Sequence, residues 1–221
     1  MNSGNDIDFD LYLVTDRHQT GGRPLDAVVK EVLAGGVRAV QLRERDLPVR
    51  EALRWAETLR SLTAEFGARL LINDRVDICL AVGADGVQLR ADSLPIPAVR
   101  KILGPDCLIG RSVHSASEAI EAERAGADFV VLGPIYDTPS KRAMGKPLGL
   151  SEIRSSAVRV AIPIFAIGGI RSDRIQEVIG NGARGVAVIS ALLQAPNPRE
   201  AAEALLREIK AQRPAATITQ V

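Results

Sequence analysis

The chain has 221 residues, a length that suits one α/β barrel or two small domains. Its 28 basic and 27 acidic residues leave a formal net charge of +1, which argues against a nucleic-acid or membrane-surface partner, since either needs a dominant basic field. With 2 histidines a multi-histidine metal site is excluded, and Cys79 and Cys107 lie in apolar runs typical of buried, reduced thiols. The polar N-terminus lacks a signal-peptide core, and no apolar run reaches the ~20 residues that span a bilayer. We therefore expect a cytoplasmic protein with no membrane contact.

Short apolar runs of β-type composition alternate with longer amphipathic segments along the chain. Each run is nearly continuous in hydrophobic residues, which is typical of parallel strands covered on both faces. The segments between the runs have helical periodicity, as at Leu53, Ala56, Leu59 and Leu62. In chain order, the expected strands are residues 11–15, 39–42, 69–73, 86–89, 107–110, 129–133, 164–167 and 185–189.

A glycine-led pattern recurs before the second, fourth, sixth and eighth expected strands, at residues 36–42, 83–89, 126–132 and 182–188. The chain thus repeats a βαβα quarter four times, which predicts a single (β/α)₈ TIM barrel. A doubly wound open sheet is the alternative and explains the fourfold spacing less well. We expect a flexible N-terminal segment at residues 1–10, the barrel at 11–211 and a C-terminal tail at 212–221.

Polar residues just after each strand face the active site of such a barrel, so these positions carry the candidate chemistry. Their gathering at predicted strand ends is a stronger signal than any single motif. The candidates, in chain order, are Gln41, Arg43, Arg45, Asn73, Asp74, Asp92, Ser112, His114, Thr138, Ser140, Lys141, Gly169, Ile189 and Ser190.

Arg43 and Arg45 alternate along an extended segment, so their two guanidinium groups can converge on a phosphate or diphosphate. The alternative is an ion-paired rim in which both arginines are neutralised by Glu44 and Asp46.

Asp74 follows a buried strand, where a carboxylate suits Mg²⁺ beside a diphosphate. The alternative is that Asp74 caps the helix that begins near Arg75. His114 could act as an acid or base near neutral pH, and the alternative is a helix-capping or packing histidine.

Gly168 and Gly169 follow the seventh strand, and glycine lets backbone amides approach an anion. Loops after strands seven and eight form the usual phosphate site of these barrels. The sequence therefore predicts a phosphate site here, with a plain tight turn as the alternative. The loop after strand six adds hydroxyls and Lys141, which together form an oxyanion cradle.

These motifs together resemble the thiamine-phosphate synthase family and its relative, the TenI-like thiazole tautomerase, from Leu11 to about Lys210. The family is a (β/α)₈ barrel, in agreement with the strand count. The most specific segments are residues 41–44 (QLRE), 72–74 (IND), 133–136 (GPIY), 138–141 (TPSK) and 166–170 (AIGGI).

The resemblance implies a transferase of thiamine biosynthesis. Hydroxymethylpyrimidine diphosphate loses pyrophosphate with help from Mg²⁺, and the nitrogen of hydroxyethylthiazole phosphate captures the pyrimidine cation. Catalytic roles are expected for Arg43, Ser112, His114 and Lys141, and a homodimer is expected. The resemblance assigns the pyrimidine diphosphate to Gln41, Arg43, Arg45, Asn73 and Lys141, with Ser112 near the pyrimidine, Mg²⁺ to Asp74, and the thiazole phosphate to Thr138, Ser140, Gly169, Ile189 and Ser190. Asp92 is a further candidate Mg²⁺ ligand, reaching in from an adjacent position.

Three departures keep a thiazole tautomerase, or a regulator that binds thiazole phosphate without catalysis, open as alternatives. Arg45 stands where the synthase usually has lysine. The synthase pattern His-x-Gly-Gln-x-Asp is replaced by residues 88–93, which puts Ser93 in place of a second Mg²⁺ ligand and Asp92 one residue early. Residues 110–115 (GRSVHS) are similar to the tautomerase branch, yet Pro134 stands where a tautomerase has its proposed proton-transfer histidine.

Overall fold

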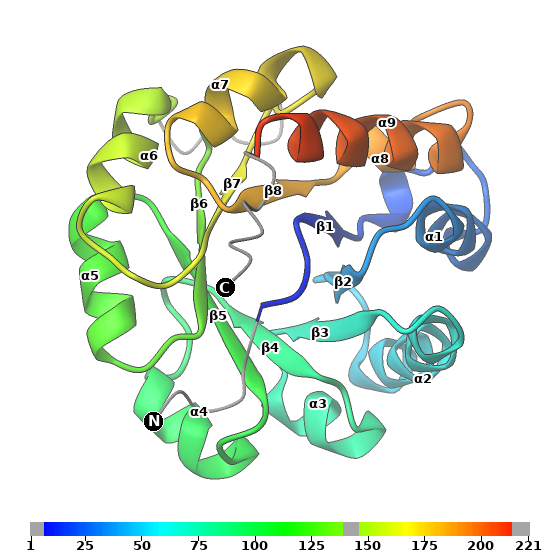
Figure 1. Cartoon of the computed structure of the whole chain (residues 1–221). Helices are drawn as coiled ribbons and strands as arrows, with labels where there is room; N and C mark the ends of the chain where they lie inside the picture. Colours follow the sequence, from blue (N-terminus) through cyan, green and yellow to red (C-terminus); the bar gives the residue numbers. More distant parts are fainter. Residues whose placement is uncertain (1–6, 139–145, 214–221) are drawn as a thin grey trace, which may run out of the picture.

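The computed structural model describes residues 7–138 and 146–213. Eight parallel strands close into a barrel in sequence order, with β8 paired to β1 (Figure 1). This confirms the predicted (β/α)₈ barrel. The strands are β1 (Leu11–Val14), β2 (Ala39–Leu42), β3 (Arg69–Asn73), β4 (Gly86–Leu89), β5 (Leu108–Val113), β6 (Phe129–Leu132), β7 (Ile164–Ile167) and β8 (Gly185–Val188).

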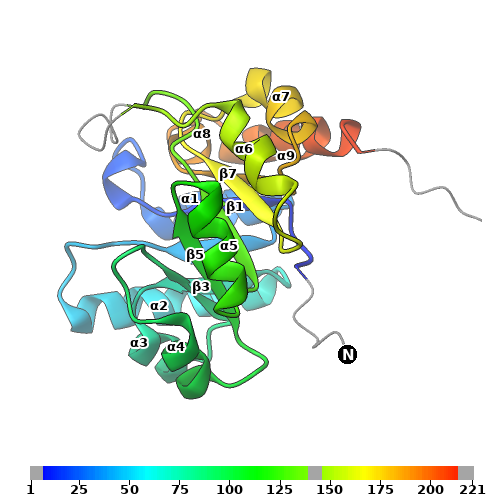
Figure 2. The same ribbon diagram turned by 90° about the vertical axis from the view of Figure 1, so that its left-hand side faces the viewer.

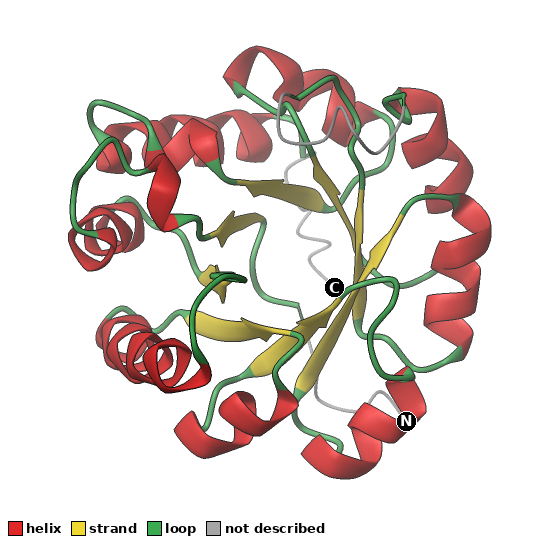
Figure 3. Cartoon of the chain, turned by 180° about the vertical axis from the view of Figure 1, so that it is seen from behind, coloured by secondary structure: helices red, strands yellow, loops and turns green. Residues whose placement is uncertain are grey.

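Helices follow the strands and surround them as an outer ring (Figure 3). Seen from the side, α5 lies against the strands and α9 packs near α7 (Figure 2). The helices are η1 (Arg17–Gln19), α1 (Leu25–Ala34), α2 (Val49–Glu65), α3 (Val76–Val82), α4 (Ile96–Leu103), α5 (Ala116–Arg124), α6 (Leu150–Ala157), η3 (Ser172–Arg174), α7 (Ile175–Gly180), α8 (Ser190–Leu193) and α9 (Pro198–Ala211). No helix in these described residues is long and apolar enough to cross a membrane.

Strand β5 is the one element that differs clearly from its expected range, because it runs to Val113 instead of ending at residue 110. Its extra residues pair with β6, Ser112 with Val131 and Val113 with Leu132. Every other strand begins and ends within one residue of its expected position. As a result, Ser112 belongs to the barrel wall and not to the loop after it.

The N-terminal half of the barrel is filled by aromatic side chains. Phe9, Tyr12, Phe129 and Phe165 pack against one another, and the rings of Phe9 and Phe165 stack with centroids 4.9 Å apart. Ile7 is also buried, so the packed barrel begins at least four residues before the expected boundary. A core this tightly filled leaves the C-terminal ends of the strands as the place for a site.

The chain beyond α9 is also tied to the barrel. Arg213 donates to the Asp10 carboxylate at 2.7 Å and pairs there beside Arg184. Arg213, the last residue that the structure describes, is therefore held against the barrel two residues past the expected end at 211.

Candidate active site

Four polar side chains form a hydrogen-bonded layer inside the C-terminal half of the barrel. Gln41 on β2 donates to Asn73 on β3 at 3.1 Å, and Gln88 on β4 donates to Ser112 on β5 at 3.1 Å. Both glutamines are almost fully buried. A hydrogen bond fixes the orientation of each buried amide, so these two pairs form a polar floor beneath the strand ends.

The sequence predicted Gln41, Asn73 and Ser112 as site residues, and the structure brings them together. It missed Gln88, which lies directly opposite Asn73 in the register of β3 and β4. Alternation along β4 could have identified it, since residues two apart on a strand face the same side.

The alternative of an ion-paired rim around Arg43 and Arg45 is wrong. Glu44 and Asp46 are instead paired with Arg17, at 3.1 Å to Glu44 and 2.7 Å to Asp46. Neither Arg43 nor Arg45 has a salt bridge to any residue that the structure describes. Both guanidinium groups therefore remain available to an anion.

Electrostatics around Arg43 favour an anionic ligand. Burial lowers the pKa of its guanidinium, and the neighbouring charges of Arg45 and Arg90 lower it further. The carboxylates of Asp16 and Glu44 act in the opposite direction. Three cationic groups near one another repel, and an incoming diphosphate would relieve that repulsion.

Asp74 does not cap the following helix. Helix α3 begins at Val76 with Arg75 as its N-cap and without a side-chain cap. Asp74 has φ 57°, and its carboxylate turns toward the end of β4. There it accepts from Nε of Arg90, from the Arg90 backbone N–H at 3.1 Å and from the Ser93 hydroxyl.

The Mg²⁺ site expected from Asp74 and Asp92 does not fit this arrangement. Arg90 bridges the two carboxylates, since its Nη2 lies 3.3 Å from Asp92 while its Nε binds Asp74. Asp92 is itself 74% exposed. Mg²⁺ demands near-ideal octahedral oxygen ligands, and here both oxygens of Asp74 are already engaged. Within residues 7–138 and 146–213, no group of three or more His, Cys, Asp or Glu could hold a metal ion.

The turn after β7 has the geometry of an anion site. Gly168 and Gly169 adopt φ values of 101° and 66°, and a Cβ on Gly169 would lie 2.9 Å from Cβ of Tyr136. The N–H groups of Gly169 and Ile189 donate to no acceptor in the described part of the chain. Ser190 opens α8, a short extra helix of the kind that completes phosphate sites in these barrels.

The loop after β6 is only partly described. Thr138 lies at its start, whereas Ser140 and Lys141 fall outside the described residues. Their expected contacts with substrate stay predictions.

His114 lies at the start of α5 and pairs with that helix. Its N–H donates to Oε2 of Glu118 at 2.8 Å, and its Nδ1 lies 3.3 Å from the same oxygen. The hydroxyl of Ser115 caps α5 by accepting from the Glu118 N–H at 3.2 Å. These contacts give His114 a role in the start of the helix, and its catalytic role stays a prediction.

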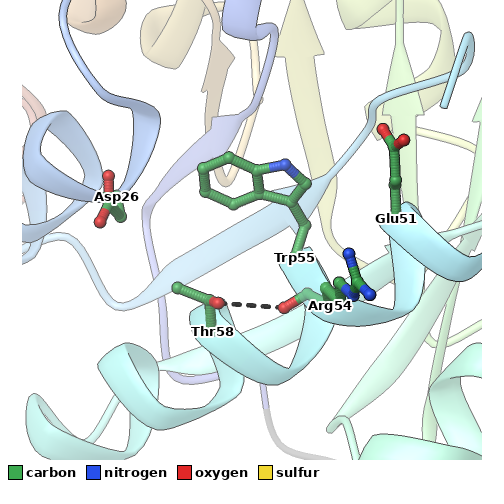
Figure 4. Close-up of a pocket in the computed structure, with 5 residues that line it drawn as sticks. All are labelled: Asp26, Glu51, Arg54, Trp55 and Thr58. Carbon is green, nitrogen blue, oxygen red and sulfur yellow. Dashed lines mark hydrogen bonds between the residues drawn. The ribbon is translucent and has the colours of Figure 1, made fainter.

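A surface depression of about 290 Å³ lies between α1 and α2, away from the polar floor (Figure 4). Trp55 lines it with Asp26, Glu51, Arg54 and Thr58, and Thr58 donates to the Arg54 carbonyl at 3.0 Å. None of the predicted site residues lines it, so it is separate from the candidate site.

Comparison with known proteins gives one consistent result. The thiamine monophosphate synthase family matches residues 11–192. A relative from Geobacter sulfurreducens is 54% identical over 90% of this chain and 94% of its own length. The thiamine-phosphate synthase of Moorella thermoacetica is 45% identical over 91% of this chain and 95% of its own. Among solved structures, the thiamine phosphate pyrophosphorylase of Pyrococcus furiosus superposes with a TM-score of 0.85 at 40% identity, covering 92% of this chain and 96% of that one.

Proposed function

The chain belongs to the thiamine monophosphate synthase family, and from that premise we propose that it joins a pyrimidine diphosphate to a thiazole phosphate at the C-terminal ends of its strands. It is an enzyme of thiamine biosynthesis, of the transferase class. We assign the two substrates to different sides of the barrel mouth because two features of the site are separated from each other. The polar floor lies on β2 to β5, beside two arginines after β2 that have no salt bridge among the described residues; the glycine turn lies after β7, where the N–H groups of Gly169 and Ile189 have no acceptor among those residues.

We assign the pyrimidine diphosphate to the β2–β5 side. Gln41, Asn73 and Ser112 supply the amide and hydroxyl groups that orient the pyrimidine ring, and Gln88 holds Ser112 in place. Arg43 and Arg45 meet the diphosphate charge, with Lys141 from the loop after β6 as a further cation. Guanidinium groups suit this task because their fork of donors matches phosphate oxygens.

We assign the thiazole phosphate to the β7–β8 side. Gly169, Ile189 and Ser190 would donate backbone N–H groups to it, and Thr138 and Ser140 would add hydroxyls. The two substrates then meet over the polar floor, at the centre of the barrel mouth.

In the reaction the bond between the pyrimidine methylene and the diphosphate oxygen breaks, and the electron pair leaves with pyrophosphate. The thiazole nitrogen then forms a bond to the methylene cation. Fixed cations placed where the leaving-group charge develops lower the barrier without any proton transfer from the protein. Arg43 and Lys141 therefore carry most of the catalytic effect in this proposal.

A thiazole tautomerase is the second candidate, favoured by the 110–115 segment and by the engaged carboxylate of Asp74. It would need a general base, for which His114 is the candidate. A cytoplasmic location, a homodimer and use of Mg²⁺ remain expectations for the chain.

The test is incubation of the protein with hydroxymethylpyrimidine diphosphate, hydroxyethylthiazole phosphate and Mg²⁺, followed by measurement of pyrophosphate and thiamine phosphate in equal amounts. Isomerisation of a thiazole carboxylate phosphate without pyrophosphate release would support the tautomerase instead. A protein that binds thiazole phosphate but turns over neither substrate would be the non-catalytic regulator.

A further inference from the structure

The positively charged group next to Asp74 is the guanidinium of Arg90. Arg90 lies two residues beyond Gln88, so it continues the inward-facing side of β4 past the strand end. Its Nε donates to Oδ2 of Asp74, and its Nη2 pairs with Asp92 at 3.3 Å. Among the described residues its Nη1 has no hydrogen-bond partner, and the side chain is 38% exposed. Carboxylates therefore hold Nε and Nη2 of Arg90, whereas its Nη1 is open to a ligand.

Arg90 also lies near the arginines assigned to the diphosphate. Its charge is among those that lower the pKa of Arg43, which follows β2. Strand β3, which ends next to Asp74, lies between β2 and β4 in the barrel. Arg43 and Arg90 therefore follow the two strands that flank β3, one on each side of Asp74.

Ser93 completes this arrangement. Its hydroxyl donates to Oδ1 of Asp74 and accepts from the Arg90 backbone N–H at 2.9 Å. An aspartate at this position would place a second negative charge against Oδ1 of Asp74. The neutral hydroxyl of Ser93 instead adds no third negative charge to the two carboxylates, Asp74 and Asp92, that Arg90 already pairs with.

We propose that Arg90 is the resident cation of the diphosphate subsite, held by Asp74 where a divalent metal would otherwise be bound, and that it binds the departing pyrophosphate together with Arg43. The proposal rests on the proposed function, because it concerns the same subsite. The electron pair of the broken C–O bond leaves with pyrophosphate, whose negative charge the guanidinium groups of Arg90 and Arg43 then meet. Asp74 is then a positioning residue for Arg90 and not a metal ligand.

The first test is calorimetric binding of inorganic pyrophosphate in the presence of EDTA. The wild-type protein is expected to bind it without metal, and Arg90→Gln is expected to weaken binding about tenfold or more, as for loss of a charge-assisted hydrogen bond. Arg75→Gln is the matched control, because Arg75 is also 38% exposed and ion-paired but turns toward Asp77. The affinity of Arg75→Gln for pyrophosphate should stay within roughly twofold of the wild-type value, since this variant keeps every group at the subsite. Equal affinities of wild type and Arg90→Gln would overturn the proposal, as would wild-type binding that requires Mg²⁺.

The second test asks whether Asp74 binds metal at all. Mn²⁺ is titrated into the substrate-free protein and followed by electron paramagnetic resonance. We expect either that the wild type binds no Mn²⁺, or that Asp74→Asn binds Mn²⁺ as the wild type does. Mn²⁺ binding by the wild type that Asp74→Asn abolishes would overturn the proposal, because Asp74 would then be a metal ligand.

Failure of this proposal and failure of the proposed function are distinguishable. If the wild type and Arg90→Gln form thiamine phosphate equally well, and only with Mg²⁺, Arg90 is not the resident cation while the synthase assignment stands. If no pyrophosphate is released under any metal condition, the synthase assignment fails, and pyrophosphate binding still decides the role of Arg90.

Discussion

The guanidinium carbon of Arg174 lies over the ring of Tyr136, 4.2 Å from its centroid. Arg174 also donates to the carbonyl of Gly169, and the hydroxyl of Tyr136 donates to Glu177 on α7. Burial and this hydrogen bond raise the pKa of Tyr136, so the phenol remains a donor at physiological pH. The loop after β6 and the glycine turn after β7 are therefore held together by side chains from η3 and α7.

Replacing Arg174 should loosen the phosphate turn. We expect Arg174→Ala to weaken binding of hydroxyethylthiazole phosphate roughly tenfold, because the turn loses a cation–π contact and a hydrogen bond from a charged donor. Calorimetry measures the affinity. Arg171→Ala is the control, since Arg171 is 64% exposed and pairs with Asp173. Equal affinities in the two variants would show that the contact with Tyr136 does not shape the site.

A second prediction separates backbone strain from contact at Gly169. Gly169 and Gly67 have similar φ values of 66° and 60°, but a Cβ on Gly67 would meet nothing within 4 Å. We expect Gly67→Ala to lower the free energy of unfolding by about 1 kcal/mol because of its left-handed φ, and Gly169→Ala to lower it further, because its Cβ would also press against Tyr136. Only Gly169→Ala should also weaken thiazole phosphate binding, because it displaces Tyr136. Thermal unfolding and calorimetry test both parts, and unchanged affinity in a folded Gly169→Ala would remove Gly169 from the phosphate site.

The fold could be predicted because hydrophobic runs and glycine-led repeats are local signals that a closed parallel barrel requires. The end of β5 could not, since Arg111 and Ser112 are polar and the strand continues to Val113 through pairing with β4 and β6. The packing of Ile7 and Phe9 was also missed. Ile7 and Phe9 alternate with Asp8 and Asp10, a pattern too short to predict burial by itself, and they become core only when the barrel closes over them.

Ser112 was expected in the loop after β5, and the longer strand places it in the barrel wall instead. Side-chain direction was predictable where strand position decides it, as for Gln41 and Asn73. It was not predictable at Asp74, because a single left-handed φ value turns the carboxylate from its own helix to the neighbouring strand. Arg90 was missed for the same reason. Its importance comes from a pairing between β3 and β4 that the linear sequence does not display.

The third prediction concerns the polar floor. A Cβ on Gly110 would lie 2.3 Å from Oε1 of Gln88 and 2.3 Å from Cζ of Phe129. Gly110→Ala should therefore destabilise the protein by about 1–3 kcal/mol, the usual effect of overpacking, and should slow turnover by displacing Gln88. Gly180→Ala is the control, because a Cβ there meets nothing within 4 Å. Denaturant unfolding measures both, and equal stability of the two variants would contradict the packing described for the floor.

The fourth prediction compares two arginine-to-lysine changes. Arg43→Lys keeps the charge but removes the fork of donors at a half-buried position, so turnover should fall about tenfold or more. Arg45→Lys introduces the residue that the synthase family usually has there, and its turnover should stay near that of the wild type. Steady-state release of pyrophosphate measures both. A loss at Arg45 that equals the loss at Arg43 would mean that both side chains bind the diphosphate through the same bidentate geometry.

The fifth prediction concerns the thiols of Cys79 and Cys107, whose sulfur atoms lie 3.8 Å apart. The hydrogen bond with Cys79 lowers the pKa of Cys107, and the same bond together with burial raises the pKa of Cys79. As the pH rises, Cys107 should therefore lose its proton first and react with iodoacetamide at a lower pH than Cys79 does, because the thiolate is the reactive form.

Removing the thiol of Cys79 should reverse part of this effect. In Cys79→Ala the pKa of Cys107 should move upward, since burial then acts without the opposing hydrogen bond, and the midpoint of its alkylation profile should shift to higher pH. Peptide mass spectrometry after brief alkylation across a pH series follows each cysteine separately. An unshifted Cys107 profile in Cys79→Ala would mean that the two thiols are not hydrogen-bonded in solution, and that another group, such as the nearby Arg100, sets the reactivity of Cys107.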